Sequence, residues 1–433
     1  MTSQLLGDAR AISDQWLHDL DLVTLTEQRL GAAGLLDVNV AVDIVAIGKA
    51  SREMATAASD VLGDNLRRQL IICDEESAAR SERSSEVVVG EHPIPGAQSL
   101  NAGASLLSFL DQPTRADCTL FLVSGGASSL CVVPESPVTL ADLRGLWDAA
   151  MTFGLDITTL NQLRASTSAI GGGGVLRHVR TARSLSLIMV DNVISGSAWV
   201  ASGLTYEYRP SDDDVSALLE CVGLGATPLG GRLLEAARNR TSEVAPIGTD
   251  HENVILAEAS MMLDAAVAEA RRRGYRVVDM GSQVHGDATD VSEAWASILR
   301  AQVTSNDAVA VLGVGEVTVR VHGTGSGGRC QEFAWLFAKE VAELQRDAVF
   351  LARASDGRDF VEGVGGAWVD GSTVERAHSL DVDWKEVAEA NDSHSALGAL
   401  GQLIEGGHTG WNLCDLYVAL TQGTGTVRRT YKF

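Results

Sequence analysis

Residues 117–130 read DCTLFLVSGGASSL. The apolar run Leu120–Val123 is long enough for a strand buried on both faces of a parallel sheet. Gly125 and Gly126 follow, and adjacent glycines permit a tight turn in which backbone N–H groups approach a ligand. Ser128 and Ser129 come next, and a helix that begins near them would direct its N-terminus at a bound anion such as phosphate. The alternative is an ordinary strand-to-helix turn that uses glycine for geometry alone.

A second stretch of the same kind lies upstream. Val42–Ile47 has the composition of a buried strand, Gly48 and Lys49 follow directly, and Arg52–Leu62 suits a helix. The stretch is not a P-loop, because the long glycine loop before the lysine is missing, and it is not a GxGxxG fingerprint. Lys49 is one of four lysines in the chain. We expect it at the carboxyl end of a strand, where open α/β sheets bind ligands; the alternative is a solvated surface lysine.

Apolar runs and amphipathic stretches alternate along the chain, which predicts a doubly wound parallel sheet in the first half and a second, smaller α/β domain in the second half. We expect the domains to span residues 1–245 and 246–433, with the linker within or just after the polar, acidic stretch 206–252. The main expected elements are a helical region over 5–35, strands at 42–47, 71–73, 87–89, 120–123, 185–190, 254–257, 275–280, 308–312 and 317–321, and helices at 52–62, 99–110, 140–153, 260–273, 287–302 and 333–344.

Three further motifs carry chemistry. Asp191 ends an expected strand, where a carboxylate suits Mg²⁺ or a ribose hydroxyl, or caps the next element. Gly171–Gly174 is either a mobile hinge or a backbone surface held against a ligand. The segment His322–Glu332 presents Arg329 among four glycines before an expected helix. Such an arginine suits a phosphoryl group or a carboxylate; the alternative is a structural ion pair with Glu332 or Glu316.

Composition narrows the class of protein. Apolar residues make up 45% of the 433 residues, and no stretch approaches the roughly 20 apolar residues of a membrane span. The net charge of −23 argues against nucleic acid and anionic membranes as partners. The six cysteines are scattered without a C-x-x-C pair, and the first ten residues lack the basic and apolar regions of a secretion signal. These features predict a cytoplasmic protein.

The motifs, taken in order, resemble the glycerate 2-kinase family, whose C-terminal half is the module called MOFRL. The resemblance runs from about residue 10 to about residue 420. The matching motifs are Gly-Lys-Ala, His-Pro-x-Pro, Ser-Gly-Gly-x-Ser, Asn-x-x-Arg followed by Gly-Gly, Ala-Ser-Gly-x-Thr, Gly-Glu-x-Thr-Val, Gly-Gly-Arg-x-Gln-Glu, Asp-Gly, Asn-Asp-Ser and Thr-Gly-x-Asn.

This resemblance implies a Rossmann-like domain and a smaller MOFRL domain, with ATP- and Mg²⁺-dependent phosphorylation of the 2-hydroxyl of D-glycerate in the cleft between them. It implies three catalytic residues, Lys49, Arg329 and Glu316, and a metal ligand, Asp191. Cofactor binding would fall to Gly48, Ser124, Gly125, Gly126, Ser128, Ser129 and Asp191. Substrate binding would fall to Arg164, Gly172, Gly173, Asp356, Asn391 and Asn412. The resemblance leaves a homodimer open.

The chain departs from the family pattern at four places, one of which is Ala46, where the family has Gly before the Gly-Lys turn. After Asn-x-x-Arg the family usually reads Lys-His-Leu-Ser-x-Ile-Lys-Gly-Gly, whereas residues 165–173 read ASTSAIGGG. The family's Asp-Val-x-Gly-Asp-Asp is replaced by DNVISG at 191–196, and Ser-Gly-Gly-Glu by GVGE at 313–316. Fewer cations favour a neutral or larger acceptor, a related hydroxy acid or a polyol. The alternatives are another reaction on the same scaffold, such as hydroxypyruvate reduction, and a catalytically silent ligand-binding homologue.

Overall fold

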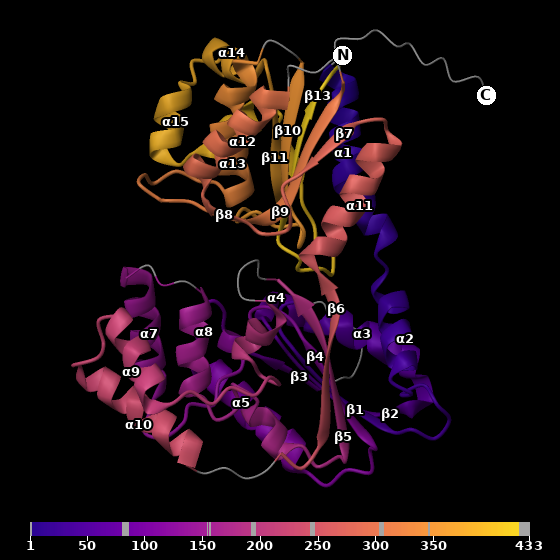
Figure 1. Ribbon diagram of the computed structural model, residues 1–433, viewed down its shortest axis with the longest axis vertical. Coiled ribbons are helices and arrows are strands. Elements are labelled where there is room, and N and C mark those ends of the chain that lie inside the picture. The colour runs from indigo at the N-terminus through magenta and orange to yellow at the C-terminus, as the bar shows by residue number, and fades with distance from the viewer. Residues whose placement is uncertain are drawn as a thin grey trace. The chain divides into compact units, whose positions relative to one another are not determined.

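The structure is a computed structural model that describes residues 2–79, 86–153, 155, 157–191, 196–242, 247–302, 307–344 and 347–423. The chain forms two compact units (Figure 1). The N-terminal unit comprises Asp21–Ala257, and the C-terminal unit comprises Met1–Leu20 together with Glu258–Phe433. The predicted boundary at 245/246 falls outside the described residues. The first twenty residues, assigned from sequence to the N-terminal domain, belong to the C-terminal unit.

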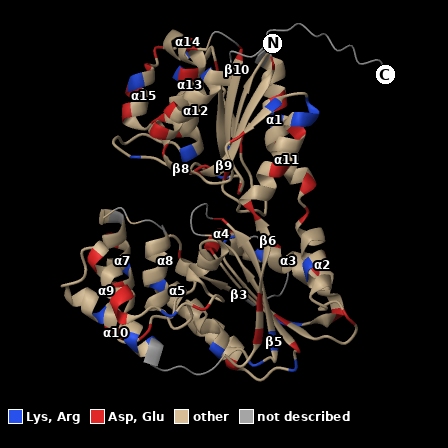
Figure 2. Ribbon diagram, viewed as in Figure 1, with Lys and Arg blue, Asp and Glu red and all other residues tan. Residues whose placement is uncertain are grey.

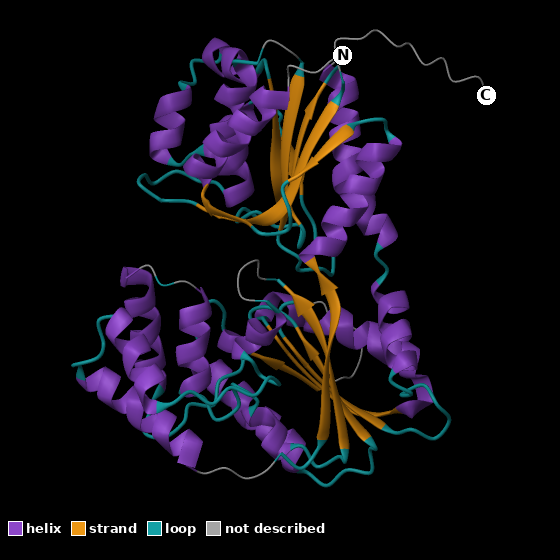
Figure 3. Cartoon of the chain, in the orientation of Figure 1, coloured by secondary structure: helices purple, strands orange, loops and turns teal. Residues whose placement is uncertain are grey.

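The N-terminal unit is built on a six-stranded sheet with the order β3-β2-β1-β4-β5-β6. Neighbouring strands from β3 to β5 pair in parallel, which confirms the predicted doubly wound sheet. Helices cover both faces of this sheet (Figure 3). The strands are β1 (Val42–Ile47), β2 (Leu66–Cys73), β3 (Glu86–Val89), β4 (Cys118–Val123), β5 (Arg183–Val190) and β6 (Asp250–Glu258).

The central strands β1 and β4 are buried along their whole length, because a parallel sheet covered on both faces requires near-continuous apolar side chains. The helices of this unit are α2 (Leu22–Ala32), α3 (Ser51–Leu62), α4 (Glu75–Ala79), α5 (Ala97–Asp111), α6 (Ala127–Leu130), α7 (Leu140–Phe153), α8 (Ile157–Ser166), α9 (Asp212–Cys221) and α10 (Pro228–Ser242), with 3₁₀ turns η1 (Gly63–Asn65), η2 (Gly174–His178) and η3 (Ser197–Ser202). Helices α7 to α10 share a separate apolar core. Helices α9 and α10 lie within the stretch 206–252, and the chain passes from one unit to the other between Ala257 and Glu258, just after that stretch.

The C-terminal unit contains a mixed sheet with the order β12-β11-β10-β13-β9-β7, and β8 pairs with β9. Its strands are β7 (Arg276–Asp279), β8 (Val284–Asp287), β9 (Val309–Thr318), β10 (Ala348–Ala354), β11 (Val364–Asp370), β12 (Leu403–Glu405) and β13 (Asp415–Thr421). The two strands predicted at 308–312 and 317–321 fall largely in the single strand β9, which ends at Thr318, so residues 319–321 lie outside it. Its glycines, Gly313 and Gly315, lie within the strand and pair with β13.

Helices pack on both faces of this second sheet (Figure 1). They are α1 (Thr2–Asp19), α11 (Ala259–Arg272), α12 (Ala288–Gln302), α13 (Arg329–Ala342), α14 (Thr373–Ser379), α15 (Trp384–Ala390) and α16 (Ser393–Ala399). The core under α12 and α13 contains an aromatic cluster of Trp295, Phe333, Phe350 and Tyr417. On the other face, α1 packs against β10, β13 and α11. The helical region predicted over 5–35 is therefore two helices, α1 and α2, which belong to different units.

Acidic and basic residues are interspersed over both units, and the acidic residues outnumber the basic ones 57 to 34 (Figure 2). Within the described ranges, no helix is both long enough and apolar enough to cross a lipid bilayer.

Candidate active site

The strand order of the first sheet places three of the predicted motifs at one edge. Strands β1, β4 and β5 are neighbours and run parallel, so the residues that follow their carboxyl ends lie at the same edge. These residues are Lys49 after β1, Ser124–Gly126 after β4 and Asp191 after β5. The chain leaves β1 toward β2 on one side, whereas β4 and β5 lie on the other. The edge between β1 and β4 is therefore the topological switch point, where such sheets bind ligands.

The turns after β1 and β4 are joined by hydrogen bonds. The backbone N–H of Lys49 donates to the carbonyl oxygen of Gly125 at 2.9 Å, and the N–H of Ala50 donates to Ser124 Oγ at 3.0 Å. Gly48 has a φ of +131°, and a Cβ at this position would overlap Ser124. Both the conformation and the close approach therefore require glycine at position 48.

Lys49 and His92 both lie beside the glycine turn. A Cβ built on Gly126 would be 3.1 Å from His92 Cδ2 and 3.2 Å from Lys49 Cγ. Burial, together with the positive charges of Lys49 and Arg164, lowers the pKa of His92 to about 4, so the imidazole is neutral at pH 7. Among the described residues, the Lys49 ammonium has no hydrogen-bond or ion-pair partner. Sequence analysis did not identify His92 as a site residue, although it lies in the His-Pro-x-Pro motif.

Asp191 contacts the same turn. A Cβ at Gly125 would overlap the Asp191 carboxylate, so this carboxylate lies directly against the backbone of the turn. Within the described ranges, no group of three His, Cys, Asp or Glu side chains could hold a metal ion. Residues 192–195, where the family pattern carries further acids, lie outside those ranges. One carboxylate is compatible with Mg²⁺, which binds proteins through one or two carboxylates and keeps phosphate oxygens and water as its other ligands.

The two predicted phosphate-binding serines have partners within the protein. Ser128 Oγ and Ser202 Oγ are 2.7 Å apart, and Ser129 Oγ donates to the carbonyl oxygen of Pro93 at 2.7 Å. Helix α6 begins beside Ser128 but has only four residues. These hydroxyls therefore fix the turn against η3 and the loop after β3.

The glycine run after α8 is fixed by backbone hydrogen bonds. The N–H groups of Gly172 and Gly173 donate to the carbonyl oxygens of Ser202 and Gly203 at 3.1 and 2.8 Å. The buried Arg240 donates to the carbonyl oxygens of Gly171 and Gly172, each at 2.6 Å. Of the two readings of this run, these contacts favour a fixed backbone surface over a mobile hinge.

Arg164, at the end of α8, is held differently. Its guanidinium carbon lies 5.0 Å from the centroid of the Trp147 ring, a cation–π contact. Burial lowers the pKa of Arg164 to about 10, so the group remains charged at pH 7. Among the described residues, its guanidinium has neither a hydrogen bond nor an ion pair.

The C-terminal unit contains a second cluster, centred on Arg329. This arginine is the first residue of α13. It pairs with Glu316 in β9 and, through Nε and a terminal nitrogen at 2.6 and 3.0 Å, with both carboxylate oxygens of Asp415. Asp415 is fully buried at the start of β13, and sequence analysis did not identify it. The expected pairing of Arg329 with Glu316 is present, whereas Glu332 contacts Asn391 instead.

The remaining predicted residues of this unit are Asn391, Asp356 and Asn412. Asn391 holds the glycine loop, and the other two lie close in sequence to the ends of β10 and β13. Asn391 accepts from the N–H groups of His322 and Gly323 and donates to the carbonyl oxygen of Arg320 and to Glu332. Its amide is thus occupied in holding the loop that leads to Arg329. Asp356 and Asn412 lie near the paired residues Ala354 and Asp415 in sequence, and Asp356 accepts from the N–H of Arg358 at 2.9 Å.

Asp359 caps the helix that carries Arg329. Its carboxylate accepts from the N–H groups of Cys330 and Gln331 at 3.0 and 2.8 Å. Burial and the nearby charge of Asp415 raise the pKa of Asp359 to about 6. The predicted site residues thus form one group in each unit, Lys49 with the Ser124–Gly126 turn and Asp191 in the first, and Arg329 with Glu316 in the second.

Comparisons with known proteins cover nearly the whole chain. A family model described as a domain of unknown function, DUF4147, matches residues 10–229, and the MOFRL family model matches residues 309–415. The chain is 28% identical to the D-glycerate 2-kinase of Thermotoga maritima over 87% of this chain and 90% of that protein. It is 27% identical to the glycerate 2-kinase of Pyrococcus horikoshii over 96% of both chains.

Solved structures agree with the sequence comparisons. The crystal structure of glycerate kinase from Thermotoga maritima superimposes with a TM-score of 0.82 at 25% identity. The match covers 97% of this chain and all of that one, so the two-unit architecture is shared along its length.

Proposed function

Because this chain belongs to the glycerate 2-kinase family, we propose that it transfers the γ-phosphoryl group of ATP to a hydroxyl of glycerate or a related hydroxy acid. Family membership makes the chain a phosphotransferase that acts on an alcohol group. The identity of the phosphoryl donor, the acceptor and the roles of individual residues are the parts that we propose.

The observation that carries the proposal is the position of Lys49. Its side chain follows β1 at the switch point of the sheet, its backbone is bonded to the turn after β4, and no described residue neutralises its charge. Phosphoryl transfer requires little covalent chemistry from the protein and depends on positioning and on neutralising the charge of the phosphate oxygens. A cation that no described residue pairs with, at a glycine-lined turn in a chain with a net charge of −23, suits this task.

We assign separate roles to the neighbours of Lys49. The backbone of Ser124–Gly126 lies close enough to Lys49 for phosphate oxygens to contact both. His92, neutral at pH 7 because of its low pKa, adds no charge and can accept a proton or donate one hydrogen bond. Asp191 would be the protein ligand of Mg²⁺, and the ion would supply further positive charge to the phosphate oxygens.

Arg329 has a different character from Lys49. Two carboxylates, Glu316 and Asp415, already surround it, so it brings no net positive charge to the site. These partners fix the plane of the guanidinium, and about a third of the side chain's surface remains exposed. We propose that its remaining N–H groups bind a carboxylate or phosphate in a fixed orientation, and that both clusters serve one reaction.

The proposal extends to the location and the oligomeric state of the enzyme. We propose a cytoplasmic protein that acts on a small molecule, as a monomer or a homodimer. Light scattering coupled to gel filtration would decide between the two states.

The direct test supplies ATP, Mg²⁺ and D-glycerate and measures ADP formation, with the phosphorylated product identified by ³¹P NMR. We expect phosphorylation at the 2-hydroxyl. A parallel reaction with hydroxypyruvate and NADH or NADPH, followed by absorbance of the nicotinamide, tests the reductase alternative. Oxidation of the nicotinamide without any ADP formation would overturn the proposal, and so would the absence of nucleotide binding at millimolar ATP by calorimetry.

A further inference from the structure

A pocket lies within the N-terminal unit beside the site of Lys49. It is lined by residues at the end of β1, in α6, in α7 and α8, and in η3. Its walls are largely apolar and include Ile47, Cys131, Leu146, Ile170 and Leu204. The space inside is about 50 Å³, about four times the volume that one buried water molecule requires. It matches a short aliphatic group rather than a nucleotide.

The hydroxyl groups of the pocket are bonded to the protein. Ser128 and Ser202 are paired with each other, and Ser202 also donates to Asn161 Oδ1 at 3.1 Å. Thr167 Oγ1 donates to the carbonyl oxygen of Leu163 at 2.9 Å, and Ser168 Oγ accepts from the N–H of Gly171 at 3.1 Å. With these donors engaged, the pocket wall offers a ligand mainly apolar contact.

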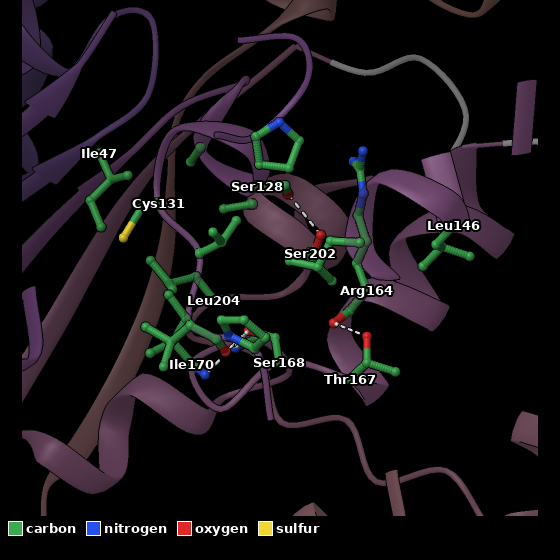
Figure 4. A pocket seen from close by; sticks show the side chains of 18 residues that line it. Ile47, Ser128, Cys131, Leu146, Arg164, Thr167, Ser168, Ile170, Ser202 and Leu204 are labelled. Atoms are coloured by element: carbon green, nitrogen blue, oxygen red, sulfur yellow. Dashed lines mark hydrogen bonds between the residues drawn. The ribbon is translucent and has the colours of Figure 1, made fainter. Parts of the chain in front are cut away.

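Arg164 is the exception. Its side chain runs beside Ser202, and its guanidinium lies at the end of the pocket opposite Ile170 and Ser168 (Figure 4). The aromatic face of Trp147 supports one side of it. No described residue supplies a carboxylate or a carbonyl oxygen to its five donors. A partly desolvated guanidinium without a partner carries an energetic cost that a bound anion would remove.

The pocket also reaches the glycine turn beside Lys49, because Ala127 and Ser128, which follow Gly126 directly, line it. Lys49 and Arg164 both lower the pKa of His92, which lies beside Gly126. The pocket therefore has a positive end that borders the Lys49 turn and an apolar end that is closed by Ile170, Cys131 and Leu204.

We propose that this pocket selects the acceptor: a 2-hydroxy acid with a short branched aliphatic substituent, whose carboxylate pairs with Arg164 and whose substituent fills the apolar end. The inference rests on the proposed kinase function. In the reaction, the 2-hydroxyl oxygen bonds to the γ-phosphorus, the bond from that phosphorus to the β–γ bridging oxygen breaks, and ADP leaves with the electron pair. The hydroxyl proton passes to a protein base or to water.

The size of the expected preference follows from buried area. Each methylene moved from water into an apolar site contributes a factor of about four in affinity. Lactate and 2-hydroxy-4-methylpentanoate share the carboxylate and the hydroxyl but differ by three carbons. We expect the branched acid to bind at least tenfold more tightly than lactate. This factor is smaller than the gain in affinity if all three additional carbons were fully buried.

Calorimetry of the full chain with each acid, without nucleotide, tests binding independently of catalysis. Arg164→Met keeps an aliphatic stem against Trp147 and removes the charge. The affinity for both acids should therefore fall by a similar factor of ten or more. Cys131→Leu puts a larger side chain into the apolar end, so it should lower the preference for the branched acid several-fold. Cys118→Leu, at the opposite end of β4, is the matched control for a larger side chain in the same core and should leave the preference unchanged.

The outcomes separate this inference from the proposed function. If the chain phosphorylates D-glycerate but binds lactate and the branched acid equally, the pocket does not select the acceptor and the kinase proposal stands. If no acid is phosphorylated but the branched acid binds preferentially through Arg164, the pocket assignment stands and the kinase proposal fails. A folded Cys131→Leu protein with an unchanged preference would overturn the assignment of the apolar end.

Discussion

The backbone N–H of Lys49 donates to the carbonyl oxygen of Gly125 at 2.9 Å, although the two residues are 76 positions apart. This bond joins the turns that follow two adjacent parallel strands. It fixes the direction in which the only strand-end lysine of the N-terminal unit leaves the backbone. The charge of Lys49 is thereby held at the switch point by main-chain geometry, and no residue that the structure describes forms a salt bridge with it.

Replacement of Lys49 by methionine tests whether its charge is used in the reaction. Methionine retains most of the aliphatic stem, and the backbone bond to Gly125 does not depend on the side chain. We expect kcat to fall by two or more orders of magnitude, which corresponds to about 3 kcal/mol of transition-state stabilisation. Lys385→Met, at an exposed position in α15, is the control and should retain full activity. Near-normal turnover of the Lys49→Met enzyme would remove Lys49 from the mechanism.

The titration of His92 reports the same charge without an activity assay. Lys49 disfavours the imidazolium, so its removal should raise the pKa of His92 from about 4. Burial remains the larger cause, and the pKa should stay below the ordinary value of 6.5. Because the folded state binds this proton less readily than the unfolded state, His92 makes the protein less stable as the pH falls from 6.5 to about 4. NMR of the imidazole carbons in both proteins measures the shift, and an unchanged pKa would place Lys49 away from His92.

Gly125 is predicted to be indispensable for the position of Asp191. A Cβ at residue 125 would overlap the Asp191 carboxylate, so Gly125→Ala must displace that side chain. We expect a loss of turnover of at least tenfold and a weaker dependence on Mg²⁺ concentration, if Asp191 is the metal ligand. Gly231→Ala is the control: Gly231 lies in α10 with open space around its Cα, and alanine there should stabilise the helix by about 0.5–1 kcal/mol. Full activity of Gly125→Ala would show that Asp191 tolerates displacement.

Variants of Arg329 and Asp415 distinguish a role in stability from a role in catalysis in the C-terminal unit. Arg329→Met leaves the fully buried Asp415 without its main partner. We expect the free energy of unfolding to fall by about 3 kcal/mol, the lower end for a broken buried pair, because Arg329 is partly exposed. Arg329→Met combined with Asp415→Asn should recover much of this stability, since the uncompensated charge is gone, yet remain inactive. Recovery of activity in the double variant would limit Arg329 to a structural role.

Sequence patterns predicted those residues of the candidate site that follow strand ends. Lys49, Ser124–Gly126 and Asp191 each follow an apolar run, and parallel strands bring such positions to one edge of a sheet. Sequence analysis did not identify Asp415, because this residue precedes an apolar run and has no glycine or motif beside it. Its partner, Arg329, is also 86 residues away in the sequence. His92 was not identified for a related reason. The low pKa of its imidazole depends on burial and on Lys49 and Arg164, which are distant in the sequence. The occupied amide of Asn391 could not be predicted either, because a motif does not reveal which donors fold around it.

Sequence patterns also could not predict to which unit the N-terminal helix belongs, for the same reason. An amphipathic stretch reveals that one face is apolar but not which sheet covers it. In the structure, α1 packs on the C-terminal unit: Trp16 is 1% exposed and contacts Trp411 edge to face at 6.2 Å, and Asp14 pairs with Arg353.

We therefore expect Trp16→Ala to destabilise the C-terminal unit selectively, by about 3–5 kcal/mol as for other buried tryptophans. Hydrogen exchange followed by mass spectrometry should show faster exchange in β10 and β13, which contact α1, and unchanged exchange in β1 and β4. Trp199→Ala is the matched control, because Trp199 lies in η3 of the N-terminal unit and contacts Tyr208 at 4.9 Å; it should leave β10 and β13 protected. If Trp16→Ala instead loosened the N-terminal sheet, the first twenty residues would have to be returned to the N-terminal domain.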